Sequence, residues 1–149
     1  MPMSRLSNTT PFPNLLLDRV MRFLSDTEWR VLCVIVRQTY GWHKSEDWLS
    51  HSQLKSQTGR ESAAVSRGID TLVKGGLIVV RDRFDRRLHS TAERRRSRSG
   101  LVFAVHPLLL DSALYRRSIG IGDFTFRTSE SENNKSKFNS KKETLRGSA

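Results

Sequence analysis

Residues 50–80 read SHSQLKSQTGRESAAVSRGIDTLVKGGLIVV, and this stretch predicts a helix, a tight turn, a second helix and a strand. Ser50 and Gln53 have the spacing of a capping box, which predicts that the first helix starts there. Leu54 is the apolar anchor of that helix. Gly59 is expected to end it, because glycine adopts a positive φ at little cost.

The second helix is expected to begin at Ser62, whose hydroxyl suits a helix cap. Its apolar residues recur at the helical spacing i, i+4, i+7, which predicts one stripe facing a core. They are Val65, Ile69 and Leu72. Gly75-Gly76 is expected to end this helix, and the β-rich run from Leu77 to Val80 follows.

The opposite face of the second helix carries only small and polar residues: Ser62, Ala63, Ser66, Arg67, Asp70 and Thr71. Such a face suits the major groove of DNA, because small residues allow close approach and arginine can bind guanine with two hydrogen bonds. The alternative is an ordinary solvated helix face in a small α/β domain. The two interpretations differ in whether Arg67 contacts a base.

The charge of the chain favours a polyanionic partner. The 149 residues carry a formal net charge of +11, from 26 basic and 15 acidic side chains. The excess is greatest just after the helix pair, where residues 81–117 contain ten basic and four acidic side chains. This distribution favours nucleic acid over a membrane surface. The longest apolar run, residues 101–110, is too short to span a bilayer.

Two β-rich runs, Leu77–Arg81 and Leu101–Val105, flank a long basic segment over residues 81–100. This outline predicts a β-hairpin with an extended tip, or wing. The segment contains eight arginines: Arg81, Arg83, Arg86, Arg87, Arg94, Arg95, Arg96 and Arg98. Arginine suits phosphate contacts and a narrow minor groove. The alternative is a solvated run of charges that is disordered without a partner.

The N-terminal part of the chain predicts two further helices. Asn14 is expected to cap a helix from Leu15 to about Leu24, and a capping box at Ser25–Glu28 starts another that ends near Thr39. Trp48-Leu49 is expected to form a short strand that pairs with the hairpin. The aromatic residues Trp29, Tyr40, Trp42 and Trp48 are expected to pack in the core, with base stacking by an exposed tryptophan as the alternative.

The composition changes after residue 117. Leu108 to about Arg117 is expected to form a short helix that closes the core or contacts a second copy. Residues 118–149 are rich in Ser, Asn and Lys and predict a flexible polar tail. Within it, Phe124 and Phe126 form one apolar island. We interpret this island as a peptide that docks to a partner protein in replication or transcription, or adds a strand, and the alternative is sequence that folds back on the domain. The predicted organisation is therefore one domain over residues 1–117 and a tail.

No arrangement typical of catalysis is present in the sequence. The four histidines are scattered without metal-ligand spacing, and no phosphate-binding or nucleophile motif occurs. The single cysteine, Cys33, lies in an apolar helical run and suits a reducing cytoplasm. We therefore expect a protein that is not an enzyme, has no cofactor or metal, and acts in the cytoplasm.

Residues 11–80 resemble the N-terminal domain of the phage replication protein O family. The most specific matches are Pro13-Asn14, Thr27 to Arg30, and Thr39 to Trp42 followed by Asp47. The resemblance implies a winged-helix domain that binds repeated sites at a replication origin as a dimer. It also implies a location in a bacterial cell, in association with the nucleoid. In fuller members a C-terminal part recruits the host helicase machinery, whereas this chain ends in a short polar tail and has a longer wing.

Together these observations predict a mostly α winged helix-turn-helix domain with a small β-hairpin, binding duplex DNA by sequence. The expected contacts of the second helix are Arg60, Ser62, Ala63, Ser66 and Arg67. On the preceding helix, the residues expected to contact the DNA backbone are Ser52, Gln53 and Lys55. Those of the wing are Arg83, Arg86, Arg87, Arg94, Arg95, Arg96 and Arg98.

Three roles share this domain at the level of sequence. The first is a replication initiator of a phage or plasmid-like element, acting as a homodimer on its origin. The second is a transcriptional regulator of a mobile element. The third is an adaptor that recruits a protein through its tail, with DNA as an anchor. RNA binding is a weaker fourth, because the sequence has no aromatic platform motif.

Overall fold

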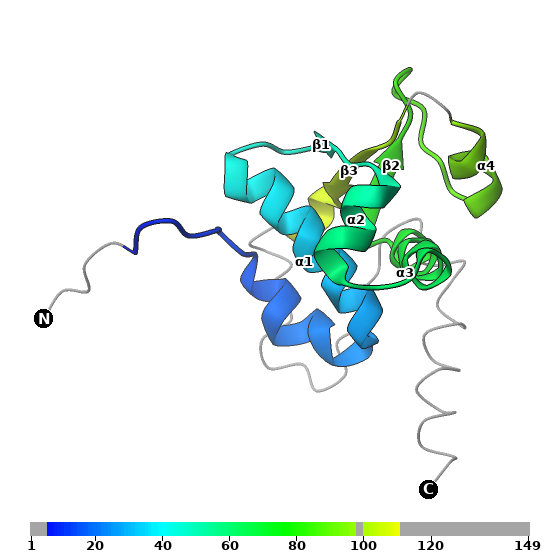
Figure 1. Cartoon of the computed structure of the whole chain (residues 1–149). Coiled ribbons are helices and arrows are strands. Elements are labelled where there is room, and N and C mark those ends of the chain that lie inside the picture. Colours follow the sequence, from blue (N-terminus) through cyan, green and yellow to red (C-terminus); the bar gives the residue numbers. More distant parts are fainter. Residues whose placement is uncertain (1–5, 98–99, 111–149) are drawn as a thin grey trace, which may run out of the picture.

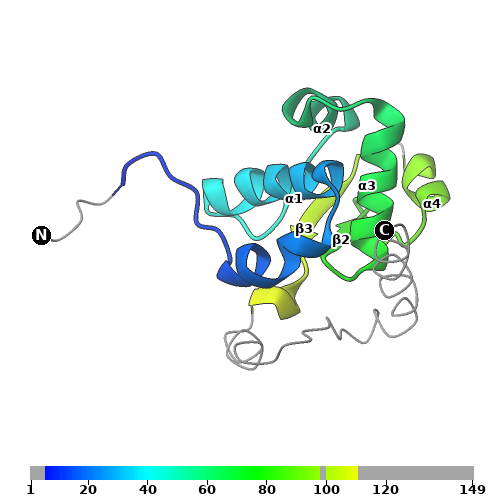
Figure 2. The same cartoon turned by 90° about the horizontal axis from the view of Figure 1, so that it is seen from below.

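The computed structural model describes residues 6–97 and 100–110, and its central element is helix α1 (Asp26–Thr39). Helix α3 (Ser62–Lys74) crosses α1, and helix α2 (His51–Thr58) lies beside the start of α3 (Figures 1 and 2). A three-stranded antiparallel sheet completes the domain. The arrangement is a winged-helix fold, as the sequence predicts.

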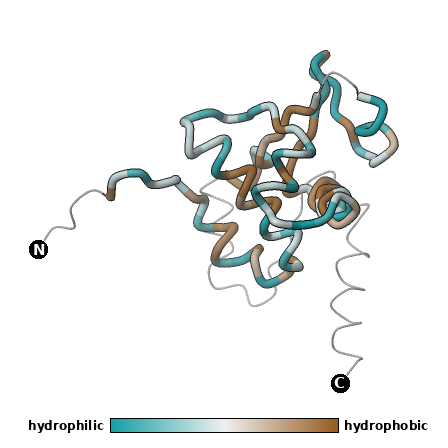
Figure 3. The backbone as a smooth tube through the Cα atoms, in the orientation of Figure 1, coloured by the Kyte–Doolittle hydropathy of each residue, from teal (hydrophilic) through white to brown (hydrophobic). Residues whose placement is uncertain are grey.

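Helix α1 begins at the capping box that the sequence predicts. The Ser25 hydroxyl accepts a hydrogen bond from the Glu28 N–H at 3.3 Å, and the Glu28 carboxylate accepts one from the Ser25 N–H at 2.6 Å. Its buried residues include Leu32 and Ile35, which join α3 and the strands in one core. Figure 3 shows hydrophobic residues where these elements meet and hydrophilic residues along the segment between the last two strands.

The helix predicted from Leu15 to Leu24 is present but is not a regular α-helix. It is wound as a π-helix, η1 (Leu16–Val20), and then as a 3₁₀-helix, η2 (Met21–Phe23). The side chain of Asn14 does not cap it: Leu15 occupies the N-cap position of η1 without a side-chain hydrogen bond. Leu16 and Val20 are buried, so the predicted apolar face is retained.

Helices α2 and α3 are joined by the predicted tight turn. The Ser50 hydroxyl accepts a hydrogen bond from the Gln53 N–H at 3.0 Å, and Gly59 ends α2 with φ of 66°. The prediction that Ser62 caps α3 is wrong. Glu61 occupies the N-cap position without a side-chain bond, and the Ser62 hydroxyl instead lies 2.9 Å from Nε2 of His51. The first turn of α3 is therefore tied to α2 by a side-chain contact.

Helix α3 packs closely against α1 at one glycine, Gly68. A Cβ atom at Gly68 would lie 3.6 Å from side-chain atoms of both Thr27 and Val31 on α1. These are ordinary van der Waals distances. Helix α3 is thus seated on α1 with room for a single methyl group.

The sheet has the strand order β1-β3-β2. Strand β1 (Asp47–Trp48) pairs with β3 (Val102–Val105), which also pairs with β2 (Ile78–Arg81). The predicted strand at Trp48-Leu49 thus starts one residue earlier, although the Leu49 N–H still donates to the Leu101 carbonyl at 3.1 Å. β2 and β3 are the two strands of the predicted wing.

The core contains fewer aromatic residues than the sequence predicts. Trp42 is 58% exposed and Trp48 is 50% exposed, so the expectation that they pack in the core is wrong for both. The Arg37 guanidinium lies 5.1 Å from the ring centroid of Trp42. Trp48 lies against Gly100, where an added Cβ would come within 2.9 Å of the indole ring.

The basic segment between β2 and β3 is folded within the described residues, against the alternative of a disordered charge run. It begins with a tight hairpin tip and then forms helix α4 (Thr91–Arg96), which lies beside α3 in both views (Figures 1 and 2). A capping box starts α4: the Ser90 hydroxyl accepts from the Glu93 N–H, and the Glu93 carboxylate accepts from the Ser90 N–H. The wing is therefore a hairpin with an inserted helix rather than an extended loop.

The described chain ends in a short 3₁₀-helix, η4 (Pro107–Leu110). The rest of the helix predicted to Arg117, the tail with Phe124 and Phe126, and Arg98 in the wing lie outside the described residues. No helix within residues 6–97 and 100–110 is long and apolar enough to cross a membrane.

Candidate nucleic-acid interface

The outer face of α3 is exposed and polar, opposite a buried apolar stripe. Val65, Ile69 and Leu72 lie in the core, as the sequence predicts. On the other side, Ala63 and Arg67 are exposed and Ser66 is partly exposed. The N-terminal half of α3 therefore presents small side chains and one arginine to solvent, which is the kind of surface that enters a major groove.

The preceding helix and the turn add positive charge beside this face. Ser52 and Lys55 are exposed on α2 and Gln53 is partly exposed. Arg60 follows the turn and is partly buried, and its Nε atom is buried without a hydrogen-bond partner in the described part of the chain. The turn itself is held to α1, because Arg30 donates a hydrogen bond to the Thr58 carbonyl at 2.9 Å.

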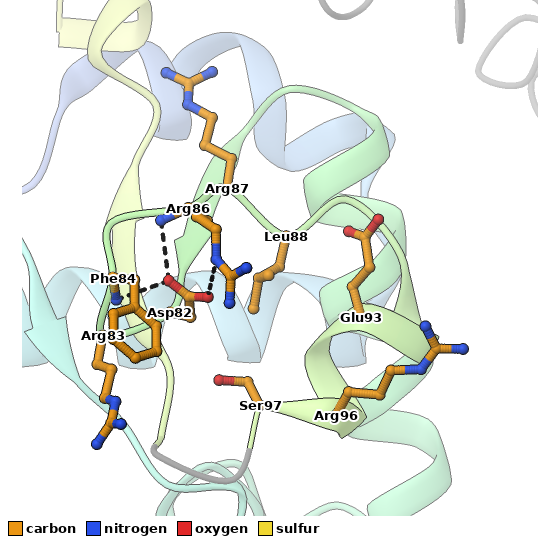
Figure 4. Close-up of a pocket in the computed structure, with 9 residues that line it drawn as sticks. All are labelled: Asp82, Arg83, Phe84, Arg86, Arg87, Leu88, Glu93, Arg96 and Ser97. Carbon is orange, nitrogen blue, oxygen red and sulfur yellow. Dashed lines mark hydrogen bonds and ion pairs between the residues drawn. The ribbon is translucent and has the colours of Figure 1, made fainter.

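A buried carboxylate fixes the hairpin tip of the wing (Figure 4). Asp82 accepts hydrogen bonds from the N–H groups of Phe84 and Arg86 at 2.9 and 3.0 Å, and from Nε of Arg86 at 2.8 Å. Burial of Asp82 acts to raise its pKa, but the hydrogen bonds from Arg86 and Phe84 outweigh burial and lower the pKa. The tip is thus held in one conformation around a charged carboxylate.

The tip presents an aromatic ring between cations. Phe84 is 63% exposed, and the guanidinium carbons of Arg83 and Arg86 lie 4.6 and 5.5 Å from its ring centroid. Sequence reasoning placed the arginines in the interface but missed Phe84. Phe84 is the one aromatic residue among the arginines of residues 81–98, and this position in the sequence could have indicated its exposure at the tip.

A cavity of about 760 Å³ lies between the hairpin tip and α4 (Figure 4). Four of its lining residues are arginines: Arg83, Arg86, Arg87 and Arg96. Its two acidic residues already have partners, since Asp82 holds the tip and Glu93 caps α4. Hydrogen bonds from the backbone N–H groups of His89 and Ser90 lower the pKa of Glu93. The net charge of the lining suits a phosphate group.

Arg94 is placed differently from the other wing arginines. It is only 7% exposed, and Nη2 donates a hydrogen bond to the Asp70 carboxylate on α3 at 2.8 Å. Arg94 thus holds α4 against α3 and does not lie on the exposed surface that the sequence analysis assigned to it. The sequence placed Asp70 on the solvated face of α3, and in the structure its carboxylate binds Arg94. Arg95 and Arg96 are exposed on the same helix.

Asp70 also binds Lys74 one helical turn away. The two side chains form an ion pair of 2.6 Å. Burial acts to raise the pKa of Asp70, but hydrogen bonds and positive charge from Lys74 and Arg94 outweigh it and lower the pKa. The carboxylate is therefore charged and neutralised by two cations. The negative charge of Asp70 in the middle of α3 is thus offset by Lys74 and Arg94.

The site has the composition of a polyanion-binding surface. Within residues 6–97 and 100–110, no group of three or more His, Cys, Asp or Glu side chains could hold a metal ion. Five of the exposed wing residues are arginines on the fixed tip and the docked helix: Arg83, Arg86, Arg87, Arg95 and Arg96. The exposed N-terminal half of α3 lies on the same helix that α4 contacts.

These features define a winged-helix protein with an enlarged basic wing. Residues 8–91 match the family model described as bacteriophage replication protein O. The match covers more than half of the chain, and the protein belongs to this family of phage replication proteins. No curated protein and no solved structure matches the chain. The family match ends at the first residue of α4, so most of that helix lies beyond it.

Proposed function

We propose that this protein binds double-stranded DNA by sequence at the replication origin of a phage or a related mobile element. The observation that carries the proposal is the exposed N-terminal half of α3, which presents Arg67 to solvent, together with the arginine-rich wing that contacts the same helix. Membership of a phage replication family supports a role in replication over one in transcription. The protein acts by binding, without a cofactor and without catalysis.

The residues divide into two kinds of contact. Ser62, Ala63, Ser66 and Arg67 face base edges in the major groove, because they occupy the first two turns of α3 that a groove admits. Lys55 and Arg60 contact the adjacent phosphates. Contacts to phosphates set the position of the protein on the duplex, whereas contacts to bases give sequence preference.

The wing contacts the neighbouring stretch of the duplex. Arg83, Arg86 and Arg87 lie around the hairpin tip with their guanidinium groups pointing in different directions (Figure 4), so each would contact a different backbone phosphate. Phe84 projects between two of these arginines and supplies an apolar contact to sugars or base edges in the minor groove. Two copies of the protein on repeated sites would extend the same contacts along the origin.

A replication assay tests this proposal. A plasmid that lacks its own origin receives fragments of the source element and is placed in cells that produce the full chain. We expect one fragment to support replication with the wild-type protein and not with the Arg67→Ala variant. A fragment that binds the protein and represses a nearby promoter, with no fragment supporting replication, would overturn the replication role and favour a regulator.

A further inference from the structure

The outer face of α3 is divided by the docking of α4. Ala63, Arg67 and Asp70 share this face, because they are separated by four and three residues. The first two are exposed and assigned to base edges, whereas Asp70 accepts hydrogen bonds from Arg94 at 2.8 Å and from the Thr91 hydroxyl at 3.3 Å. Helix α4 thus lies against the C-terminal half of the face that α3 turns toward solvent (Figures 1 and 2).

The contact that docks α4 is specific in its geometry. Nη2 of Arg94 is bound both to Asp70 and, at 3.2 Å, to the Thr91 hydroxyl of its own helix. Its Nη1 atom is buried without a hydrogen-bond partner in the described part of the chain. A buried arginine is costly unless it is well paired, so this side chain is held in one orientation by its carboxylate partner.

Helix α4 is short and strongly basic. It has six residues, and isolated helices shorter than about 12 residues are marginal in water. It carries three consecutive arginines, of which only Arg94 turns toward α3 while Arg95 and Arg96 are exposed. Release of Arg94 would therefore release the two exposed arginines with it.

We propose that Arg94 is a positioning residue that clamps α4 onto α3, so that the wing and the helix that reads DNA act as one rigid body. The clamp has two consequences, which rest on the proposed DNA binding. It confines base contacts to residues 62–67, because α4 occupies the face from Asp70 onward. It also holds Arg95 and Arg96 beside α3, where they contact the phosphates that flank the major groove.

The test compares the full-length Arg94→Met variant with the matched Arg95→Met variant. We expect Arg94→Met to speed amide hydrogen exchange in residues 91–97 of the free protein, and Arg95→Met to leave it unchanged. On duplex DNA, Arg95→Met lowers the slope of log K against log salt by about 0.9, the value for one phosphate contact. Arg94→Met lowers the slope by about 1.8, although its own side chain faces α3.

Two further variants separate positioning from direct contact. In an Arg95→Met/Arg96→Met background, Arg94→Met should cause no additional loss of slope, because the two arginines that it positions are already gone. Asp70→Asn should speed exchange in α4 and lower the slope as Arg94→Met does. If Asp70 acted only through its charge, this substitution would instead strengthen DNA binding.

Each contrary result has a distinct meaning. The same loss from Arg94→Met in the wild-type and double-variant backgrounds would show that Arg94 contacts DNA itself, and would overturn the proposal. Unchanged exchange in α4 after Arg94→Met or Asp70→Asn would overturn it independently of DNA. A wild-type protein that binds no duplex would overturn the proposed function, while the exchange measurement would still test the clamp.

Discussion

Replacing Arg67 with alanine tests the base contact that we propose for this side chain, on which sequence preference should most depend. Arg67 is the sixth residue of α3, exposed, with neither a hydrogen bond nor an ion pair in the described part of the chain. Its removal breaks no internal contact, and alanine favours the helix, so the free energy of unfolding should change by no more than about 0.5 kcal/mol. Any larger effect on binding therefore comes from the DNA.

The size of that effect follows from the geometry of the contact. A guanidinium bound to two acceptors of a guanine contributes about 1–3 kcal/mol to discrimination between bases. Loss of this contact should weaken binding to the cognate duplex about 5- to 150-fold. Binding to a scrambled duplex should change much less, because non-specific affinity comes from phosphate contacts.

Fluorescence anisotropy with cognate and scrambled duplexes, at several salt concentrations, measures both quantities. Arg67→Lys is the matched control: it keeps the charge but cannot form the two-bonded fork, so it should lose preference and keep its affinity for scrambled DNA. An equal loss of affinity on both duplexes in Arg67→Ala, with a salt slope lower by about 0.9, would instead identify Arg67 as a phosphate contact and contradict the proposed base contact.

Three further predictions concern stability. Gly68→Ala should raise the free energy of unfolding by about 0.5–1 kcal/mol in urea titrations, because the added Cβ meets nothing nearer than 3.6 Å and alanine favours a helix; a loss would show that α1 and α3 lie closer. Gly100→Ala should cost about 1–3 kcal/mol, since φ is 93° and the Cβ would lie 2.9 Å from Trp48, and an unchanged urea midpoint would contradict this. The lowered pKa values of Asp70 and Asp82 stabilise the folded state at neutral pH, and this contribution should be lost as the pH falls below 3.8 through the folded pKa values. In the Asp70→Asn/Asp82→Asn variant, the free energy of unfolding should therefore fall less steeply with decreasing pH. An identical pH dependence in the variant and the wild type would argue against both pairings.

Local signals in the sequence located most of the fold. The Ser25–Glu28 capping box set the start of α1, and the Ser50 cap and Gly59 set the two ends of α2, because caps act within about four residues of one another. The helical spacing of Val65, Ile69 and Leu72 was also a short-range signal, and it correctly predicted the buried face of α3. The cap of α3 was misassigned because Ser62 was available to His51 across the turn, a contact that the spacing of residues does not reveal.

The wing shows where sequence patterns stop being informative. Helix α4 has no apolar periodicity, and it is held by an ion pair between Asp70 and Arg94, which lie 24 residues apart. The Ser90–Glu93 capping box was the only local sign of it. The arginine count correctly marked a basic surface, but eight similar side chains in sequence could not show that one of them is buried as a structural contact.

The most direct test of DNA reading by α3 is selection of bound duplexes from a random pool at about physiological salt, with the winners mapped onto the source genome. We expect one enriched motif that recurs as clustered repeats outside promoters, and loss of that enrichment in the Arg67→Ala protein. Retention of all sequences equally by the wild-type protein would contradict sequence-specific binding, and a single palindrome over a promoter would contradict origin binding.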